Sequence, residues 1–386
     1  KDKIVFKSLK FIKHGNIKLI NYDNQSYNFG NPEDDLKVTL KINKPGLTYQ
    51  VIKSGSIGMA EAYMRGDFET DNLTNLIELT AKNIKLIYKF SGLLDFPLIN
   101  NMKSIFIKNN KSRSKENIAK HYDLGNEFFS LWLDPSLTYS SAIFEKNEPN
   151  LESAQMNKYK KLLSLLHPKT GDKILEIGCG WGGFAEFVGK NYDIKMDCIT
   201  ISKKQFDYAS KRIFKNGLNE KINIKLKDYR DVGDKYNSIA SIEMIEAVGK
   251  NYLSSYFNTI KSNLSKNGRA AIQAITIDDN LFERYKTKQD FIQKYIFPGG
   301  FLPSKKSLFN LSSSKGLSIE RCDSYGFHYS NTLKLWRDEF LNKWDQISKQ
   351  GFDLNFKRMW NFYLSYCEAG FKSKNIDLIQ FSLQNR

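Results

Sequence analysis

Apolar and polar residues are spaced differently in the two parts of this chain. In the first part, short runs such as Val38–Ile42 and Tyr49–Ile52 are typical of strands between glycine turns, and Asn72–Phe90 carries apolar residues near helical spacing. From about residue 150 onward, apolar strand-like runs alternate regularly with helical segments. We therefore expect a smaller N-terminal α+β domain followed by a larger α/β domain.

The larger domain begins with a predicted helix over about Leu151–Leu166. The strands predicted after this helix lie near Lys173–Ile177, Lys195–Ile201, Ile222–Lys227, Ser238–Ile242 and Arg269–Ile277. Strands that alternate with helices indicate a mostly parallel sheet with helices on both faces. Ligands of such sheets bind where the carboxyl ends of the strands open into loops.

The first of these strands runs into a glycine-rich loop and then into a helix. Glycines let the backbone turn tightly and approach a ligand closely. Gly178, Gly180 and Gly183 also fit the GxGxxG pattern, so an NAD-dependent dehydrogenase has to be weighed. Two residues favour S-adenosylmethionine instead. Glu176 can reach the amino end of a methionine moiety, and the next strand ends on Thr200, with no carboxylate to bind the ribose of NAD.

A carboxylate and an aromatic ring close the third predicted strand. Asp228 can accept from the exocyclic amine of an adenine, and Tyr229 can stack on it. An ordinary turn at the end of a strand explains these two residues equally well. Together with the glycine loop, they favour the Rossmann-like sheet of a class I methyltransferase.

The composition bears on partners and compartment. Of the 386 residues, 59 are Lys or Arg and 42 are Asp or Glu, which gives a net charge of +17. Solvated surface lysines explain this charge as well as an anionic partner does. The four cysteines show neither metal-ligand spacing nor a disulfide framework, so we expect no metal site and a reducing compartment. No apolar run reaches the roughly 18 residues of a membrane span. We expect a cytoplasmic protein, peripheral to the inner face of the membrane.

Several segments, taken in order, resemble the cyclopropane-fatty-acyl-phospholipid synthases and the mycolic acid cyclopropane synthases. As an ordered set they are far more specific than one glycine loop. They are Ile118–Asn126, Leu133–Pro135, Thr138–Ala142, Gly178–Gly183, Thr200–Gln205, Glu243–Gly249, Lys294–Gly300 and Tyr363–Cys367. The segment Ser56–Tyr63 resembles the additional N-terminal domain of bacterial members more weakly.

The resemblance implies a division of the chain and a chemistry. Residues 1–100 would form a lipid- or membrane-associated or dimerisation domain, 101–115 a linker and 116–386 the catalytic domain. The enzyme would methylate the double bond of an unsaturated acyl chain of a phospholipid at an anionic membrane surface, forming a cyclopropane fatty acid. A homodimer is an open alternative to a monomer. The implied cofactor-binding residues are Tyr139, Ser140, Glu176, Gly178, Cys179, Gly180, Trp181, Gly182, Gly183, Thr200, Ser202, Gln205, Asp228 and Tyr229.

In this family the general base is thought to be a bound bicarbonate, held by a Glu, a His, a Tyr and backbone N–H groups near a Cys. Glu246 and Tyr329 match the Glu and the Tyr, although a helix-start carboxylate and a loop aromatic are the structural alternatives. The chain departs from the pattern at Ser141, which replaces the Cys, and at Gln273, which replaces the His; the Glu-His pair of the family appears here as Glu246 followed by Ala247. Glutamine keeps a hydrogen-bond donor but cannot titrate. The departures leave a methylene- or methyl-branched product open beside the ring.

Two other classes of protein are alternatives to a lipid methyltransferase. Amino-directed nucleic-acid methyltransferases carry an Asn/Asp-Pro-Pro-aromatic loop after the fourth strand, where this chain has Glu243–Glu246 and no proline. The Pro-Cys nucleophile of cytosine-C5 enzymes is also absent, so we expect no nucleic-acid partner. A catalytically inactive lipid-binding homologue is the second alternative, because the Cys and the His are both replaced.

Overall fold

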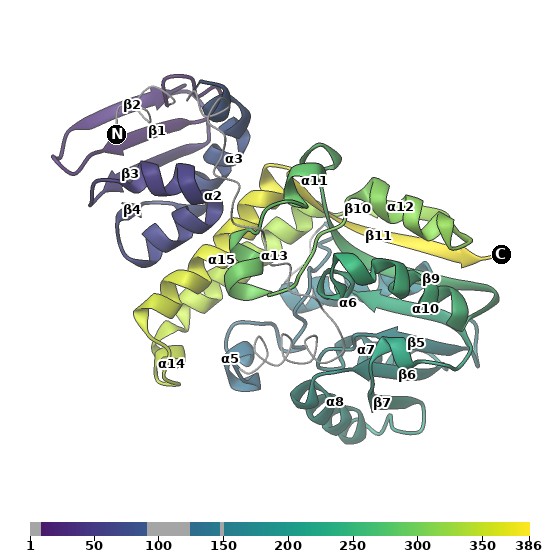
Figure 1. The fold of residues 1–386 in the computed structure, drawn as a ribbon. Coiled ribbons are helices and arrows are strands. Elements are labelled where there is room, and N and C mark those ends of the chain that lie inside the picture. The colour runs from purple at the N-terminus through teal and green to yellow at the C-terminus, as the bar shows by residue number, and fades with distance from the viewer. Residues whose placement is uncertain (1–8, 91–123, 147–149) are drawn as a thin grey trace. The chain divides into compact units, whose positions relative to one another are not determined.

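The computed structural model describes residues 9–90, 124–146 and 150–386. The chain divides into two compact units (Figure 1). One unit takes the N-terminal region together with residues 287–296 and 341–375, and the other takes the described residues of 124–286 together with 297–340 and 376–386. The expected linker 101–115 lies outside the described residues. Two later segments of the expected catalytic domain, 287–296 and 341–375, group with the N-terminal unit, and the expected domain boundaries stay a prediction.

The N-terminal unit contains a four-stranded sheet and the helices packed with it. Its strands have the order β2-β1-β3-β4, and β3 confirms the strand predicted at Val38–Ile42. Helix α15 packs against α3, and Thr74 donates to Glu368 at 3.1 Å between them, which explains why α15 belongs to this unit. The elements are β1 (Asn16–Ile20), β2 (Ser26–Gly30), β3 (Lys37–Ile42), α2 (Leu47–Met64), β4 (Phe68–Thr70), α3 (Leu73–Phe90), η3 (Ile292–Ile296), α14 (Trp344–Ser348) and α15 (Leu354–Lys372).

The strand predicted at Tyr49–Ile52 is wrong, since these residues lie in helix α2. A run of four residues fits helical and strand periodicity alike. The fully buried Ala60 and Ala62 lie further along the same helix, so packing beyond the short run decides its structure.

The second unit contains a seven-stranded sheet with the order β10-β11-β9-β8-β5-β6-β7. Strands β5 to β9 are parallel, as predicted, and β11 runs antiparallel between β9 and β10. The pattern of the sequence did not predict β10 or β11. The strands are β5 (Lys173–Ile177), β6 (Lys195–Thr200), β7 (Ile222–Leu226), β8 (Tyr236–Ile242), β9 (Leu264–Ile277), β10 (Leu317–Ser324) and β11 (Ile376–Asn385).

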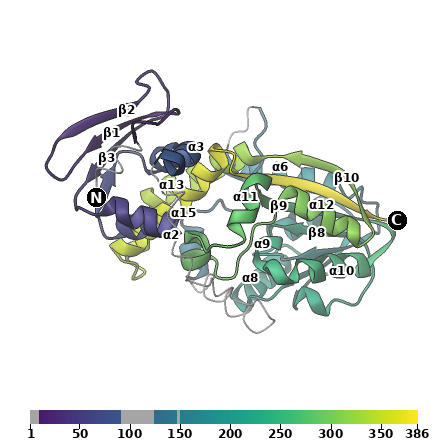
Figure 2. The same ribbon diagram turned by 45° about the horizontal axis from the view of Figure 1, so that its top comes forward.

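Helices cover both faces of this sheet, which confirms the prediction (Figure 2). Successive strand residues alternate between two cores: Leu175 packs with α10 and α12, and Ile174 packs with α6, α7 and α8. The helices of this unit are α5 (Asn126–Ser130), α6 (Leu151–Ser164), α7 (Gly183–Asn191), α8 (Lys203–Lys215), α9 (Ile245–Val248), α10 (Leu253–Asn263), α11 (Asp279–Tyr285), α12 (Lys305–Ser314) and most of α13 (Gly326–Asn342). Across the described ranges, no helix combines the length and the apolar character that crossing a bilayer requires.

Candidate active site

The glycine loop follows strand β5 at the carboxyl edge of the sheet. Gly178 has a φ of 85°, and a Cβ added there would lie 2.7 Å from Cγ of Met244. Only glycine combines this left-handed backbone with so close a neighbour. Gly180 also has a positive φ, of 53°, but an added Cβ would meet nothing within 4 Å. The loop is therefore packed at its start and has open space beside Gly180.

Glu176 lies two residues before this loop and is 2% exposed. Its Oε2 has no hydrogen-bond partner among the described residues. Burial raises the pKa of Glu176 to about 7, against the opposing effects of the Cys198 thiol and Lys158. A buried acceptor without a partner next to an open glycine loop fits the ammonium group of a methionine derivative. The residues present therefore fit S-adenosylmethionine.

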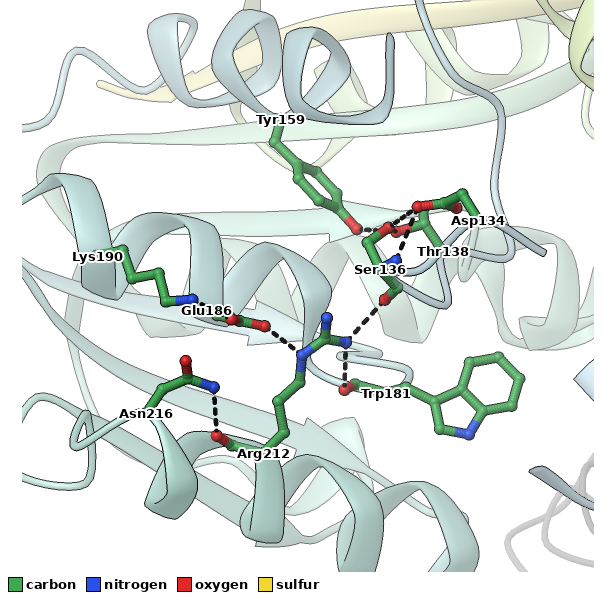
Figure 3. Close-up of polar contacts among 9 residues, drawn as sticks. All are labelled: Asp134, Ser136, Thr138, Tyr159, Trp181, Glu186, Lys190, Arg212 and Asn216. Carbon is green, nitrogen blue, oxygen red and sulfur yellow. Dashed lines mark hydrogen bonds and ion pairs between the residues drawn. The ribbon is translucent and has the colours of Figure 1, made fainter. Parts of the chain in front are cut away.

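Arg212 of helix α8 connects the glycine loop to the segment before helix α6 (Figure 3). Its Nη1 donates to the carbonyl of Ser136 at 2.7 Å and to that of Trp181 at 3.2 Å, and its Nε donates to Glu186 of α7. Thr138, two residues beyond Ser136, shares a 2.6 Å hydrogen bond with Tyr159. One guanidinium thus binds the glycine loop and the segment that leads to Tyr139 and Ser140, the two regions predicted to bind the cofactor.

The other loop residues have structural contacts of their own. Trp181 donates through its indole N–H to Asn126 at 2.9 Å, and burial raises the pKa of the Cys179 thiol well above its ordinary value. Gly182 is the N-cap of helix α7, and a Cβ on Gly183 would lie 2.6 Å from the Tyr159 hydroxyl. Their expected contacts with the cofactor stay predictions.

Tyr139 and Ser140 lie on the segment that Arg212 holds. The Tyr139 ring lies 5.3 to 5.6 Å from three other rings, centroid to centroid, and these belong to Phe129, Trp132 and Trp336. The Ser140 hydroxyl accepts from Nζ of Lys158 at 2.7 Å. Burial lowers the pKa of Lys158 to about 7, and the charge of Glu243 opposes that shift. A cation and an aromatic cluster therefore flank this segment.

The expected ribose and adenine contacts lie at the ends of β6 and β7. Thr200 donates to Gln205 at 2.9 Å, and the Ser202 hydroxyl caps helix α8. Asp228 is bound at both carboxylate oxygens by the guanidinium of Arg230, at 2.7 and 2.8 Å, and Tyr229 is buried beside it. The ion pair uses part of the acceptor capacity that the sequence analysis assigned to an adenine amine. The adenine role of Asp228 and Tyr229 stays a prediction.

Three of the four candidate catalytic residues meet at a residue that the sequence analysis did not select. Glu243 follows strand β8, and its Oε1 accepts from the backbone N–H of Ser141 at 2.9 Å and from Nε2 of Gln273 at 2.8 Å. Its Oε2 accepts from the hydroxyl of Tyr329 at 2.6 Å. Glu246, the fourth candidate, is held differently, with Oε1 accepting from the backbone N–H of Ile275 at 2.6 Å. The centre of the group is therefore Glu243.

The two glutamates differ in how much their surroundings stabilise a negative charge. Burial raises the pKa of Glu243, but its three hydrogen-bond donors and the buried Lys158 act in the opposite direction. The donors to Glu246 are backbone N–H groups, of Ile275 and of Glu246 itself, and its Oε2 has no hydrogen-bond partner within the described part of the chain. Burial, followed by the charge of Glu243, raises the pKa of Glu246 to about 8. At neutral pH Glu246 therefore holds its proton, and the hydrogen-bond donors around Glu243 favour the charged form of that carboxyl.

A hydrogen-bond chain fixes the orientation of the Gln273 amide. Nε2 of Gln380 donates to the carbonyl of Lys158 at 3.3 Å and to Oε1 of Gln273 at 2.9 Å. Because the carbonyl can only accept, Gln380 must present its N–H groups, and Gln273 must accept through its oxygen. Nε2 of Gln273 is thereby directed at Glu243. A glutamine in the position of the expected histidine is a permanent donor to this carboxylate.

The similarity of this chain to known proteins extends over most of its length. A family model described as mycolic acid cyclopropane synthetase matches residues 109–381. This chain belongs to that family. A domain of unknown function matches residues 5–89 of the same chain.

Three relatives of this family member show how far the similarity extends. Tuberculostearic acid methyltransferase UfaA1 of Mycobacterium tuberculosis is 35% identical over 355 residues, or 89% of this chain and 83% of that protein. Cyclopropane-fatty-acyl-phospholipid synthase of Escherichia coli K12 is 34% identical over 348 residues, or 88% of this chain and 86% of that protein. The crystal structure of mycolic acid cyclopropane synthase CmaA1 complexed with SAH and CTAB has a TM-score of 0.64 and 28% identity, covering 70% of this chain and 98% of that one.

These findings confirm the expected class I fold and the expected enzyme class. The protein is an S-adenosylmethionine-dependent methyltransferase of the cyclopropane synthase type. The dehydrogenase alternative is therefore wrong.

Most of the motif Ile118–Asn126 lies outside the described residues. Among the residues that are described, no group of His, Cys, Asp and Glu side chains is arranged to hold a metal ion.

Proposed function

We propose that this methyltransferase transfers the methyl group of S-adenosylmethionine to the double bond of an unsaturated acyl chain in a membrane phospholipid, and that it forms a cyclopropane fatty acid. The observation that carries the proposal is the direct contact between the expected cofactor-binding residues and the group of side chains around Glu243. Met244 packs on Gly178 of the cofactor loop, and the preceding residue, Glu243, binds Ser141 beside the expected cofactor contacts. The names of the relatives, which act on fatty acids and phospholipids, support the same substrate class.

The chemistry requires a dry, aligned site more than a strong base at the first step. When bound, S-adenosylmethionine supplies an electrophilic methyl group on its sulfonium. The π pair of the alkene would form the new carbon–carbon bond to that methyl group, the electron pair of the broken bond would stay with the leaving thioether, and the neighbouring alkene carbon would carry the positive charge. Aromatic faces attract cations, so the rings around Tyr139 suit this site. Loss of a proton from the added methyl group lets its C–H pair close the ring.

A branched product would follow from the same cation. A hydride shift to the cationic carbon, followed by loss of a proton from the methyl group, gives a methylene branch without any other reagent. A saturated methyl branch needs two further electrons and a proton from a reductant, so we do not assign it to this chain alone. Both outcomes differ from the ring in the NMR spectrum of the fatty acid.

The test is incubation of the purified protein with methyl-labelled S-adenosylmethionine and vesicles of oleoyl phospholipid. The fatty acids are then released and examined by mass spectrometry and NMR. A labelled cyclopropane is the expected product, and vesicles of saturated phospholipid should receive no label. A methylene branch would overturn the ring assignment. No labelled fatty acid from any of several unsaturated phospholipids would overturn the proposed function.

Attachment to a membrane surface is the second part of the proposal. The net charge of +17 favours an anionic lipid surface, where each basic residue contributes about 1 kcal/mol. Binding to vesicles that contain phosphatidylglycerol should weaken as salt is raised, because salt screens exposed charges. Binding that does not change with salt would indicate that the lysines only form an ordinary solvated surface.

Dimerisation through the N-terminal domain stays a prediction, to be measured by light scattering.

A further inference from the structure

The bicarbonate that the resemblance implies does not fit the site of this protein. Such an anion would need the backbone N–H near Ser141, the side chain at position 273 and the hydroxyl of Tyr329. All three donors already point at the carboxylate of Glu243, at 2.9, 2.8 and 2.6 Å. The backbone N–H of Ile275 is also taken, by Glu246 at 2.6 Å. A carboxylate of the chain itself fills the place that an external anion would need.

The backbone at Glu243 is held in a conformation that glutamate rarely adopts. Its φ is 49°, in the left-handed region, which costs a residue with a Cβ about 1–2 kcal/mol. Its N–H donates to the carbonyl of Gln273 at 2.9 Å, so the strand partner fixes the turn. Strained residues held by their surroundings cluster at functional sites. The fold maintains the strain at a position where the carboxylate meets its three donors.

We infer that Glu243 is the resident proton acceptor of this enzyme, in place of a bound bicarbonate. This inference rests on the proposed function, since it names the group that removes the proton after methyl transfer. The position supports it, because Glu243 is adjacent in sequence to Met244, which packs on the cofactor loop, and binds the residue that follows Tyr139 and Ser140. The carboxylate thus lies beside the segment expected to contact S-adenosylmethionine.

The hydrogen bonds identify the atom that takes the proton. A carboxylate oxygen has two lone pairs. On Oε1 of Glu243, both are used by N–H donors, whereas Oε2 accepts one hydrogen bond, from Tyr329. Oε2 therefore keeps a lone pair for the proton of the added methyl group. The C–H electron pair closes the ring onto the cationic carbon, Glu243 becomes a neutral acid, and it returns the proton to water before the next turnover.

The neighbouring groups favour the charged form of Glu243. The fully buried Lys158 acts to lower the pKa of Glu243, and burial raises the pKa of the neighbouring Glu246 to about 8, so Glu246 holds its proton at neutral pH. Gln273 is a positioning residue, because Gln380 directs its N–H at the carboxylate. A titratable histidine at this position would compete for the proton, and a glutamine cannot. The replacements at 141 and 273 therefore match a site whose base belongs to the chain.

The experiment compares wild-type protein with Glu243→Gly in bicarbonate-free buffer, with oleoyl phospholipid vesicles as substrate. Glycine suits the left-handed backbone at this position, so the variant should fold. We expect that added bicarbonate leaves the wild-type rate unchanged. The variant should lose at least about 100-fold in turnover, as the loss of a general base does, and bicarbonate or formate should restore part of it. Its affinity for S-adenosylmethionine should stay as in the wild type.

A matched control is Asn267→Gly, a substitution at an exposed residue with a φ of 62°, which should change none of these readouts. A wild-type rate that rises with bicarbonate, or a Glu243→Gly variant with more than about a tenth of wild-type turnover, would overturn the inference. A binding measurement that needs no turnover distinguishes failure of this inference from failure of the proposed function. Carbon-13 bicarbonate should bind the variant and not the wild type by NMR, and binding to the wild type overturns the inference even if no lipid is methylated.

Discussion

The hydroxyl of Tyr329 offers a direct test of how the active-site carboxylate is tuned. Tyr329 lies on helix α13 with its side chain buried, and it donates to Oε2 of Glu243 at 2.6 Å. Its ring packs edge-on against Trp336, with centroids 6.2 Å apart. Tyr329→Phe removes the donor and leaves this ring contact in place. The substitution therefore removes a hydrogen-bond donor from the carboxylate and keeps the ring.

The magnitude follows from the hydrogen bond that is lost. A hydrogen bond to a charged group contributes about 1.5–3 kcal/mol, and one pKa unit corresponds to about 1.4 kcal/mol. The donor stabilises the ionised form, so its removal raises the pKa of Glu243. Because the reaction needs the ionised carboxylate, the acid limb of the pH–rate profile should move to higher pH, by about one to two pH units for the free energy of that hydrogen bond.

The assay is the turnover number with oleoyl phospholipid vesicles measured across the pH range, together with the affinity for S-adenosylmethionine. The affinity should not change. Tyr236→Phe is a matched control, because the buried Tyr236 hydroxyl donates to Asp197 at 2.9 Å, at the other end of the strands. The Tyr236→Phe variant loses a comparable hydrogen bond and some stability, but its pH–rate profile should coincide with that of the wild type. An active Tyr329→Phe enzyme with an unmoved acid limb would refute the role given to Glu243.

Two further substitutions test the cofactor loop and the second glutamate. Gly178→Ala should weaken the affinity for S-adenosylmethionine, by titration calorimetry, because the new Cβ would lie 2.7 Å from Met244; Gly171→Ala, with a similar φ of 83° and open space, should not. Equal affinities in the two variants would contradict the packing argument. For Glu246, the folded pKa of about 8 exceeds the ordinary 4.5, so the folded state holds the proton longer and stability falls as pH rises between these values. Glu246→Gln should flatten that fall in the free energy of unfolding, and a parallel fall would contradict the assignment.

The sequence predicted the parts of the fold that depend on local pattern. Strands β5 to β9 and their alternation with helices follow from short apolar runs bounded by turns. The strand proposed at Tyr49–Ile52 is a helix because four residues do not distinguish the two periods. β11 becomes a strand by pairing between β9 and β10, which is information that lies outside its own residues.

The candidate site was predicted in its outline but not at its centre. Ser141, Gln273 and Tyr329 were selected from the resemblance, and the structure brings them together. Glu243 was missed, because its contact with Ser141 joins residues 102 apart and its left-handed backbone leaves no mark in the pattern. One signal was present. Ser141 and Gln273 depart from the family pattern at two positions that hold the same anion, and Glu243 had no assigned role. Together these features indicate that the anion has been replaced.

The central claim is methyl transfer to an olefin followed by loss of a proton from the transferred group. Trideuteriomethyl-labelled S-adenosylmethionine tests both steps in one mass spectrum of the fatty acids released from oleoyl phospholipid. The account predicts a cyclopropane fatty acid that keeps two of the three deuterium atoms. A product that keeps all three, or a fatty acid fraction without any deuterium, would contradict it.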